Sequence, residues 1–372
     1  MKIDVERNDL LRVMSRAQSI VERRTTIPIL SNVLIEAFDN KVSCRTTDLD
    51  IEIIDVLDAI IEGSGAVTVN ANTLYEIVRK LREGSRLNLY HDQHKGRLEL
   101  RSGSSTFSLA TLSKDDFPMM ATSEYDCNFS MPASDLKRLL EKSKFAMSTE
   151  ETRYYLNGVF FHCSEESDKK VLRAVATDGH RLARIDCDLP VSAKNIPGVI
   201  IPRKTVGEIR SILDGIEDEI AISVSSNKIR FSNSSTTITS KVIDGTFPDY
   251  SRVIPKENKN KMEVDASEFS KAVDRVSTVS LDKARAVKLV LSDDKLLLSV
   301  NSPESGMATE ELIVSYVDQP LEIGFNAKYL QELASQVDKE NAVFFFNSSG
   351  DPALMQEGED ISAIYVVMPM RV

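Results

Sequence analysis

One short pattern occurs three times in this chain, at intervals of about 125 to 130 residues. The copies lie at residues 69–77, 201–209 and 325–333. Each reads as the end of a strand, a short polar turn and the first turns of an amphipathic helix. Because this period is far longer than a solenoid unit, each repeat is predicted to be a domain.

Other landmarks keep the same spacing. Phe117-Pro118 recurs as Phe247-Pro248, and Thr47-Asp48 recurs as Thr177-Asp178, both at an offset of 130 residues. Polar stretches without apolar periodicity separate the units, as linkers do. The sequence therefore predicts three domains: 1–125, 126–254 and 255–372.

Composition defines the broad class of protein. With 372 residues, 42% hydrophobic and 28% charged, the chain is long enough to bury three cores. It has no apolar run of about 18 residues, so no membrane is expected among its partners. Its four cysteines form no CxxC pair, which favours reduced thiols and a cytoplasmic protein. The net charge of −11 argues against whole-surface binding to phosphates, although it leaves room for a local basic face.

Apolar residues at helical spacing predict two helices in every repeat. The windows are 7–21, 72–83, 134–147, 203–214, 267–279 and 327–338. Between them lie alternating segments that are typical of strands. The expected fold class is α+β, with two helices packed on antiparallel sheet in each of three repeated domains.

The predicted helices carry most of the cationic character. Their windows hold 16 basic and 11 acidic residues, whereas the rest of the chain holds 30 basic and 46 acidic residues. Lys and Arg are good helix formers, so solvated helix faces alone could explain this bias. If the helices face one axis instead, their charges sum to a lining that attracts duplex DNA without reading its sequence. The candidate DNA-binding cations are Arg79, Arg82, Arg138, Arg203, Lys204 and Arg210.

Helix packing distances test the idea of a lining. Helices pack roughly 10 Å apart, so twelve helices from two chains would surround a hole about 38 Å across. A duplex roughly 20 Å wide passes through such a hole. Six helices from one chain would leave about 19 Å, which is too narrow. A homodimer is therefore expected.

Several segments then resemble a known family. They are 1–7 (MKIDVER), 27–30 (IPIL), 153–158 (RYYLNG), 177–183 (TDGHRLA), 245–250 (GTFPDY) and 365–371 (YVVMPMR). Over its full length the chain resembles the bacterial DNA polymerase III β subunit, the replication sliding clamp. The resemblance implies that each chain forms half of a closed, head-to-tail homodimeric ring. It implies a processivity factor with no enzymatic activity and no cofactor, associated with the nucleoid. The implied partners are double-stranded DNA, the polymerase III α subunit, the clamp loader ATPase and other replication and repair proteins with a clamp-binding motif.

The resemblance also implies a groove for short partner peptides between domains 2 and 3. Leu, Val, Pro and Met suit an apolar pocket for a partner's Leu or Phe, and Arg181 and Arg371 suit the polar ends of a peptide. Segment 347–352 aligns only loosely and is assigned no role. The expected groove residues are Leu156, Thr177, Gly179, His180, Arg181, Leu182, Pro248, Arg252, Val253, Val366, Met368, Pro369, Met370 and Arg371.

Further residues match family positions that touch DNA or the second subunit. Arg24, Tyr154 and Tyr155 match DNA contacts, and Arg153 lies beside them. An aromatic ring next to an arginine suits stacking on unpaired bases. For the dimer interface, the resemblance places an apolar plug on one strand and its receptor at the end of the fifth helix of the other chain. These interface residues are Phe107, Leu109, Thr278 and Val279.

No catalytic or metal site is expected. The alternation of Asp48, Asp50 and Glu52 with apolar residues indicates the solvated face of a strand. His91 and His94 have no third ligand nearby and indicate a polar hairpin. Two alternatives stay open: a monomeric peptide-binding scaffold that never encircles DNA, and a metal-dependent nuclease that uses Asp48, Asp50 and Asp55.

Overall fold

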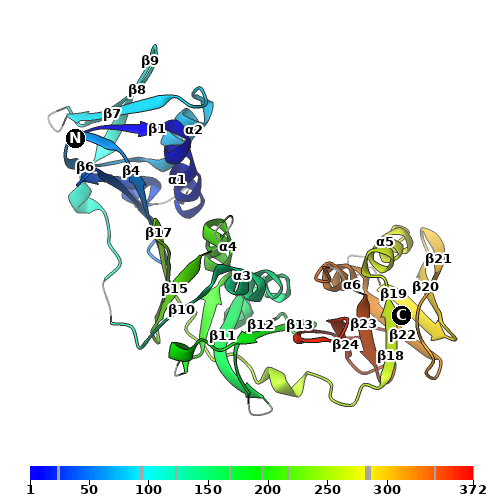
Figure 1. The fold of residues 1–372 in the computed structure, drawn as a ribbon. Coiled ribbons are helices and arrows are strands. Elements are labelled where there is room, and N and C mark those ends of the chain that lie inside the picture. The colour runs from blue at the N-terminus through cyan, green and yellow to red at the C-terminus, as the bar shows by residue number, and fades with distance from the viewer. Residues whose placement is uncertain are drawn as a thin grey trace. The chain divides into compact units, whose positions relative to one another are not determined.

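The computed structural model describes residues 1–22, 26–92, 95–121, 124–166, 169–194, 196–213, 215, 218–280, 286–338 and 341–371. The chain divides into two compact units. The first contains Met1–Ser134, Pro190–Pro197 and Lys204–Val242, and the second contains Asp135–Leu189, Gly198–Arg203 and Ile243–Val372. Each unit is described by itself below, and Figure 1 labels the elements.

One antiparallel sheet runs through the first unit. Its strands, in spatial order, are β10 (Cys127–Pro132), β15 (Glu219–Val224), β16 (Lys228–Ser232), β17 (Thr236–Lys241), β4 (Ile51–Asp58), β3 (Lys41–Thr47), β2 (Asn32–Phe38), β6 (Gly65–Asn70), β9 (Ser105–Leu112), β8 (Arg97–Ser102), β7 (Arg86–Asp92), β1 (Lys2–Glu6) and β5 (Ile60–Gly63). Helix α1 (Arg7–Ile20) packs on α2 (Ala71–Lys80) and on strands β3 and β4. Leu10, Met14, Leu74 and Val78 from these two helices are fully buried in the core between helices and sheet.

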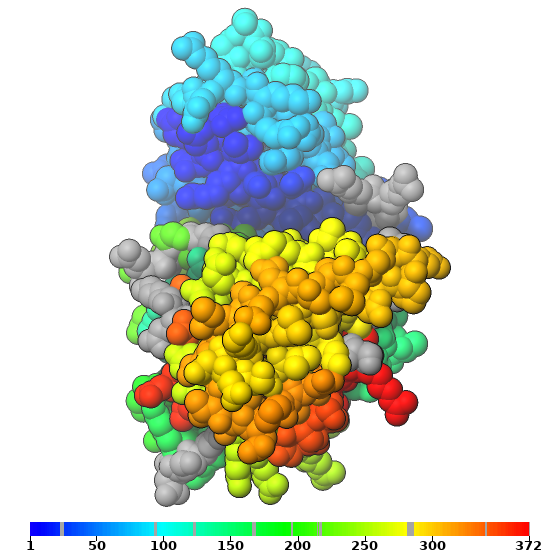
Figure 2. Space-filling view, turned by 90° about the vertical axis from the view of Figure 1, so that its right-hand side faces the viewer, coloured from blue at the N-terminus to red at the C-terminus, as the bar shows by residue number. Residues whose placement is uncertain are grey.

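The second unit has two antiparallel sheets. The larger one has the order β14 (Val199–Pro202), β11 (Gly158–Glu166), β12 (Lys169–Thr177), β13 (Arg181–Asp188), β25 (Asp360–Val367), β24 (Ala353–Glu357), β23 (Ala342–Phe346) and β18 (Asn260–Val264). The smaller one has the order β21 (Gly306–Ile313), β20 (Lys295–Ser302), β19 (Ala286–Ser292) and β22 (Leu321–Asn326). Helix α5 (Ala266–Ser277) packs on α6 (Ala327–Ala334) and on the smaller sheet. Figure 2 views the molecule from the side on which Figure 1 places β20 and β21, and this part of the third repeat forms one continuous exposed surface there.

The second repeat is shared between the two units. Its helices are α3 (Ala133–Glu141) and α4 (Arg203–Leu213). Strand β17 pairs with β4 of the first repeat, with Ile238 opposite Ile53. Strand β13 pairs with β25 of the third repeat, with Leu182 opposite Val366. Hydrogen-bonded sheets therefore continue across both repeat boundaries, which is why the compact units differ from the three predicted domains. That three-domain division stays a prediction.

The recurring sequence pattern corresponds to a capped helix start. The side chain of Asn70 accepts from the backbone N–H of Thr73 before α2, and that of Asn326 accepts from Lys328 before α6. Such caps satisfy backbone donors that the first helical turn leaves free. The predicted α+β class and the six helices are confirmed in the described part of the chain. Six short 3₁₀ segments complete the described elements: η1 (Pro28–Ser31), η2 (Lys114–Asp116), η3 (Lys144–Ala146), η4 (Glu151–Leu156), η5 (Val191–Ala193) and η6 (Tyr250–Arg252).

The expectation of a solvated acidic face is wrong for part of the segment. Asp50 is exposed, but Glu52 and Asp55 are only 4% and 2% exposed. Arg45 and Arg16 neutralise them through ion pairs of 3.0 Å and 2.5 Å. Burying a carboxylate requires such a partner because an unpaired charge is strongly disfavoured away from water. Of the carboxylates named for the nuclease alternative, Asp55 pairs with Arg16, Asp48 with Lys204 and Asp50 with Lys241, so each is an ion-pair partner in this fold.

Candidate functional site

The predicted groove residues come together in the second unit. Leu156, Leu182 and Val366 are buried and belong to one apolar cluster with Phe247. The pairing of β13 with β25 brings segment 177–183 beside the C-terminal segment. Beyond the strands, the backbone N–H of Met368 donates to the carbonyl of His180 at 2.8 Å. Residues far apart in sequence thus build one apolar floor with exposed polar and apolar side chains around it.

The turn after β12 carries the predicted groove residues Gly179 and His180. Thr177 Oγ1 donates to the carbonyl of Arg181 at 2.7 Å and accepts from the N–H of Gly179 at 3.1 Å. Gly179 has φ +88°, and a Cβ there would lie 2.8 Å from Nη1 of Arg153. The His180 ring stacks on Tyr329, with centroids 6.3 Å apart. The backbone conformation and this close approach together favour glycine at position 179.

The expected role of Arg181 requires a correction. Its side chain is 7% exposed, and its guanidinium donates to Asp178 at 3.1 Å and to the carbonyl of Phe145 at 2.7 Å. It also pairs with Glu332 of α6. The rings of Phe145 and Tyr329 lie 5.2 Å and 4.5 Å from its carbon Cζ. This guanidinium is fully engaged inside the protein, so it supports the groove instead of holding the end of a peptide.

The remaining groove residues are more accessible. Met368 is 38% exposed and Val253 is 44% exposed, while the Arg252 side chain is 83% exposed and pairs with Asp249. Pro248 and Arg371 are also exposed, and Pro369 and Met370 are half-buried. These side chains are in a position to meet a partner from solvent.

A cavity beside the C-terminus involves the segment that sequence left without a role. It has a volume of about 720 Å³. The N–H of Met370 donates to the carbonyl of Gly324 at 2.9 Å, which holds the C-terminal segment against β22. Ser349 and Gly350 line the cavity together with Lys288, Glu322, Ile323, Gly324, Pro369, Met370 and Arg371. Sequence reasoning missed this contribution because the loop carries no distinctive motif.

Most of the candidate DNA-binding cations already have partners in the protein. Arg203 donates to the carbonyls of Met147 and Ser148, and Lys204 donates to the carbonyl of Ile20 and pairs with Asp48. Arg138 donates to the carbonyl of Asp186 and pairs with Asp360. Arg79 pairs with Glu76, and its guanidinium lies over Tyr75. Arg82 and Arg210 are exposed.

The aromatic loop is partly exposed. Tyr154 is 54% exposed, and its ring meets Tyr155 edge to face at 5.8 Å. Arg153 pairs with Glu150 at 2.6 Å and donates to the carbonyl of Asp178 at 3.2 Å. The neighbouring carboxylate therefore neutralises part of the charge offered to a phosphate. Arg24 lies outside the described residues.

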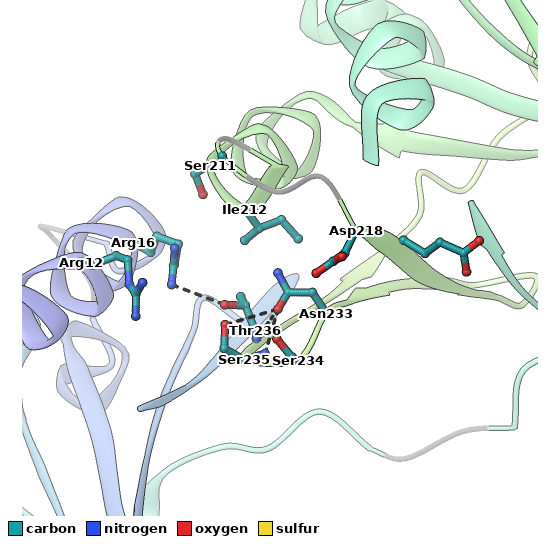
Figure 3. Close-up of a pocket in the computed structure, with 11 residues that line it drawn as sticks. Arg12, Arg16, Ser211, Ile212, Asp218, Asn233, Ser234, Ser235 and Thr236 are labelled. Atoms are coloured by element: carbon teal, nitrogen blue, oxygen red, sulfur yellow. Dashed lines mark hydrogen bonds between the residues drawn. The ribbon is translucent and has the colours of Figure 1, made fainter. Parts of the chain in front are cut away.

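A polar cavity of about 700 Å³ lies between the first-repeat helix α1 and second-repeat segments of the same unit. Figure 3 shows Arg12 and Arg16 on one side and the turn 233–236 opposite them. Arg16 reaches Oγ1 of Thr236 at 3.4 Å, and the same hydroxyl donates to Asp55 at 2.7 Å. This buried network joins the first repeat to the second, and no sequence motif indicated it.

The predicted interface residues lie on strand β9 and just after the end of helix α5. Phe107 and Leu109 on β9 are half-buried and pack against the core of their own unit. Strand β9 pairs with β8 from Ser105 to Ala110, and with β6 only at Thr111 and Leu112. Thr278 is exposed and Val279 half-buried just after α5, and β21 forms one edge of its sheet. Each unit therefore presents strand backbone without a neighbour inside the described chain.

Comparison with known proteins identifies the family. Profiles described as the N-terminal, central and C-terminal domains of the DNA polymerase III beta subunit match residues 1–121, 130–249 and 251–371. The chain belongs to the DNA polymerase III beta subunit family. The beta sliding clamps of Caulobacter vibrioides and Escherichia coli K12 are 45% and 36% identical to it, with both chains fully covered in each comparison. The crystal structure of a sliding clamp from Bartonella birtlesii, bound to griselimycin, is 47% identical with a TM-score of 0.96 and full coverage of both chains.

Family membership confirms that this is a DNA sliding clamp, a processivity factor and not an enzyme. In its described residues the clamp has no helix long and apolar enough to cross a membrane. The same residues contain no group of three or more His, Cys, Asp or Glu side chains placed to hold a metal ion. His94, one of the two histidines considered above, lies outside the described residues.

Proposed function

We propose that two copies of this clamp close head to tail around duplex DNA and hold it by topology. Each copy contributes half of the ring. The observation that carries the proposal is the pairing of the candidate cations with the protein itself. Arg79, Arg138 and Lys204 all form internal ion pairs. A cation already paired releases fewer counterions on meeting a phosphate, so adhesion is weak and closure must supply the retention.

The ring tethers its partners through the groove described above. An apolar floor of Leu156, Leu182 and Val366 would take a Leu or Phe side chain of a short linear peptide, and Met368 would adapt to its shape. The partners are the polymerase III α subunit, the clamp loader ATPase and other replication and repair proteins with such a motif. The clamp would act in the cytoplasm, on the nucleoid.

DNA contact would fall to a few exposed groups. Tyr154 and Tyr155 would stack on unpaired bases beside Arg153, and Arg24 would contact the backbone. The cations Arg79, Arg82, Arg138, Arg203, Lys204 and Arg210 would form a weak, sequence-independent lining. Phe107 and Leu109 of one chain would meet Thr278 and Val279 of the other, which would cover the unpaired edges of β9 and β21.

The test compares retention on nicked circular DNA with retention on the same molecule after linearisation. The clamp is loaded with the loader ATPase and ATP, and bound clamp is separated by gel filtration in rising salt. Topological linkage predicts persistence on the circle at high salt and rapid loss from free ends. Equal loss from both forms as salt rises would instead support a scaffold held by ion pairs.

A further inference from the structure

The wall that carries Pro248, Arg252 and Val253 is mostly irregular. Residues 242–249 belong to no helix or strand, and η6 follows at Tyr250–Arg252. An irregular segment has no ladder of backbone hydrogen bonds to fix its position. Side chains that anchor it therefore decide where the three groove residues lie.

Tyr250 anchors this wall through a chain of partly buried hydrogen bonds. Nη1 of Arg173 donates to its hydroxyl at 3.2 Å, and that hydroxyl lies 3.1 Å from Nε2 of His162. Nδ1 of His162 lies 2.8 Å from the carbonyl of Cys163, an acceptor only, so Nδ1 carries the proton. Nε2 is then an acceptor, and the tyrosine hydroxyl donates to it.

The hydrogen-bond chain ends at Arg173 and Asp186, and this end is rigid. Arg173 is 5% exposed and forms two parallel hydrogen bonds with Asp186, at 2.7 Å and 2.8 Å. A bidentate buried pair of this kind leaves one geometry for the guanidinium. The position of the Tyr250 hydroxyl is therefore set by β12 and β13, the strands that frame the groove floor.

Stacked rings hold the same wall from a second direction. Phe160 stacks on His162 with centroids 4.3 Å apart and on Phe247 with centroids 4.9 Å apart. Phe247 is buried with Leu156 and Val366 in the floor of the groove, and Tyr250 packs against that cluster. A change at His162 therefore reaches the groove both through the Tyr250 hydroxyl and through this stack.

We infer that Tyr250 and neutral His162 position the groove wall, so that the affinity for partner peptides depends on the protonation state of His162. This inference rests on the peptide groove proposed above. Tyr250 and His162 are positioning residues, since they act through Pro248, Arg252 and Val253.

Charges around His162 define the direction of the pH effect. Burial lowers its pKa below the ordinary value and the Arg173 charge lowers it further, while the hydrogen bond to the Cys163 carbonyl and the Asp186 charge oppose this shift. Arg184 pairs with the same aspartate at 3.6 Å. A lowered histidine pKa means that the unfolded chain takes up a proton near pH 6.5 before the folded protein does. Folded His162 therefore stays neutral as the pH falls through about 6.5, and the arrangement is lost as the pH falls further, through the lowered pKa of His162 in the folded protein.

The first experiment replaces Tyr250 by Phe, which removes the hydroxyl and keeps the ring. Binding of a short fluorescein-labelled peptide from the clamp-binding segment of the polymerase α subunit, chosen without histidine, is followed by anisotropy at pH 7.5. We expect roughly fivefold weaker binding, the effect of one hydrogen bond. Hydrogen exchange at residues 245–253 should quicken while exchange in β12 stays unchanged. Tyr90→Phe, at a 42% exposed tyrosine in the other unit, is the matched control.

The second experiment compares the wild type with His162→Gln from about pH 8 down to the lowest pH at which both proteins remain folded. Both proteins retain His180 in the groove, so the difference between their profiles isolates His162. The wild type should bind the peptide more weakly as the pH falls and His162 takes up a proton. The variant should lack the part of this loss of affinity that comes from His162. Identical profiles, or normal binding and exchange in Tyr250→Phe, would overturn the inference. Failure of the wild type to bind at any pH would overturn the groove itself, while the exchange result would still report on the anchor.

Discussion

Arg181 shows how the chemistry of one residue depends on its surroundings. From the sequence alone, Arg181 is predicted to be a cation beside an apolar pocket that could hold the polar end of a peptide. In the fold it is enclosed by Asp178, Glu332 and the Phe145 carbonyl, with aromatic rings near its guanidinium. Arg252, another of the predicted groove residues, has a side chain that is 83% exposed. The two arginines are therefore expected to respond very differently to substitution.

Replacing Arg181 with Met should cost about 3 kcal/mol of unfolding free energy, because two partly buried carboxylates lose their partner. Arg252→Met, the matched control, should change stability by less than about 1 kcal/mol. Urea unfolding followed by circular dichroism measures both. Equal and small effects of the two substitutions would contradict the supporting role given to Arg181.

At the scale of elements, α4 is tied to the first repeat through its polar face. Lys204 reaches the carbonyl of Ile20 at the end of α1, and Ser19 of α1 donates to Glu208 at 2.8 Å. These contacts are made by polar side chains, which a helical wheel would place on the solvent-facing side of each helix. Burial raises the pKa of Glu208 above its ordinary value, although Ser19, Lys204 and Arg16 oppose the shift.

A raised carboxyl pKa means that Glu208 contributes stability in acid, which is lost as the pH rises through the folded pKa. Glu208→Gln should therefore be modestly more stable than the wild type at pH 7. This gain in stability should disappear at pH values below the ordinary pKa of glutamate, about 4.3. Urea midpoints at both pH values measure this effect, with the exposed Glu83→Gln as control. A variant that is less stable at pH 7 would show that the ion pairs outweigh the burial.

At the scale of the whole molecule, assembly of the proposed ring would depend on two different surfaces. The proposed plug residues Phe107 and Leu109 lie on β9, and the proposed receptor residues Thr278 and Val279 follow α5. Head-to-tail contact joins unlike surfaces, so one defective surface leaves the other usable. This property separates a ring from a symmetric dimer built on one shared patch.

Leu109→Asp and Thr278→Arg should each abolish the homodimer at micromolar concentration. When the two variants are mixed, the intact receptor surface of the first should bind the intact plug surface of the second. The resulting dimer has only one sound interface, so it should fail to persist on circular DNA. Sedimentation velocity and the retention assay measure the two properties. Ile60→Asp, at an exposed residue on β5, is the control and should leave the dimer unchanged. A mixture that stays monomeric would contradict head-to-tail closure.

Local sequence alone determined the three repeats, the six helices and the α+β class, since apolar spacing and caps such as Asn70 and Asn326 act within a few residues. Tertiary structure decided which polar groups are used. The Thr-Asp turn occurs at Thr47 and at Thr177 with the same hydroxyl-to-carbonyl bond, and pairing within the second unit brings the second copy beside the C-terminal segment. Buried Asp55, engaged Arg181 and the Tyr250 anchor all depend on partners from distant strands. Burial and pairing arise from neighbours in space, and a single sequence read along its length does not contain them.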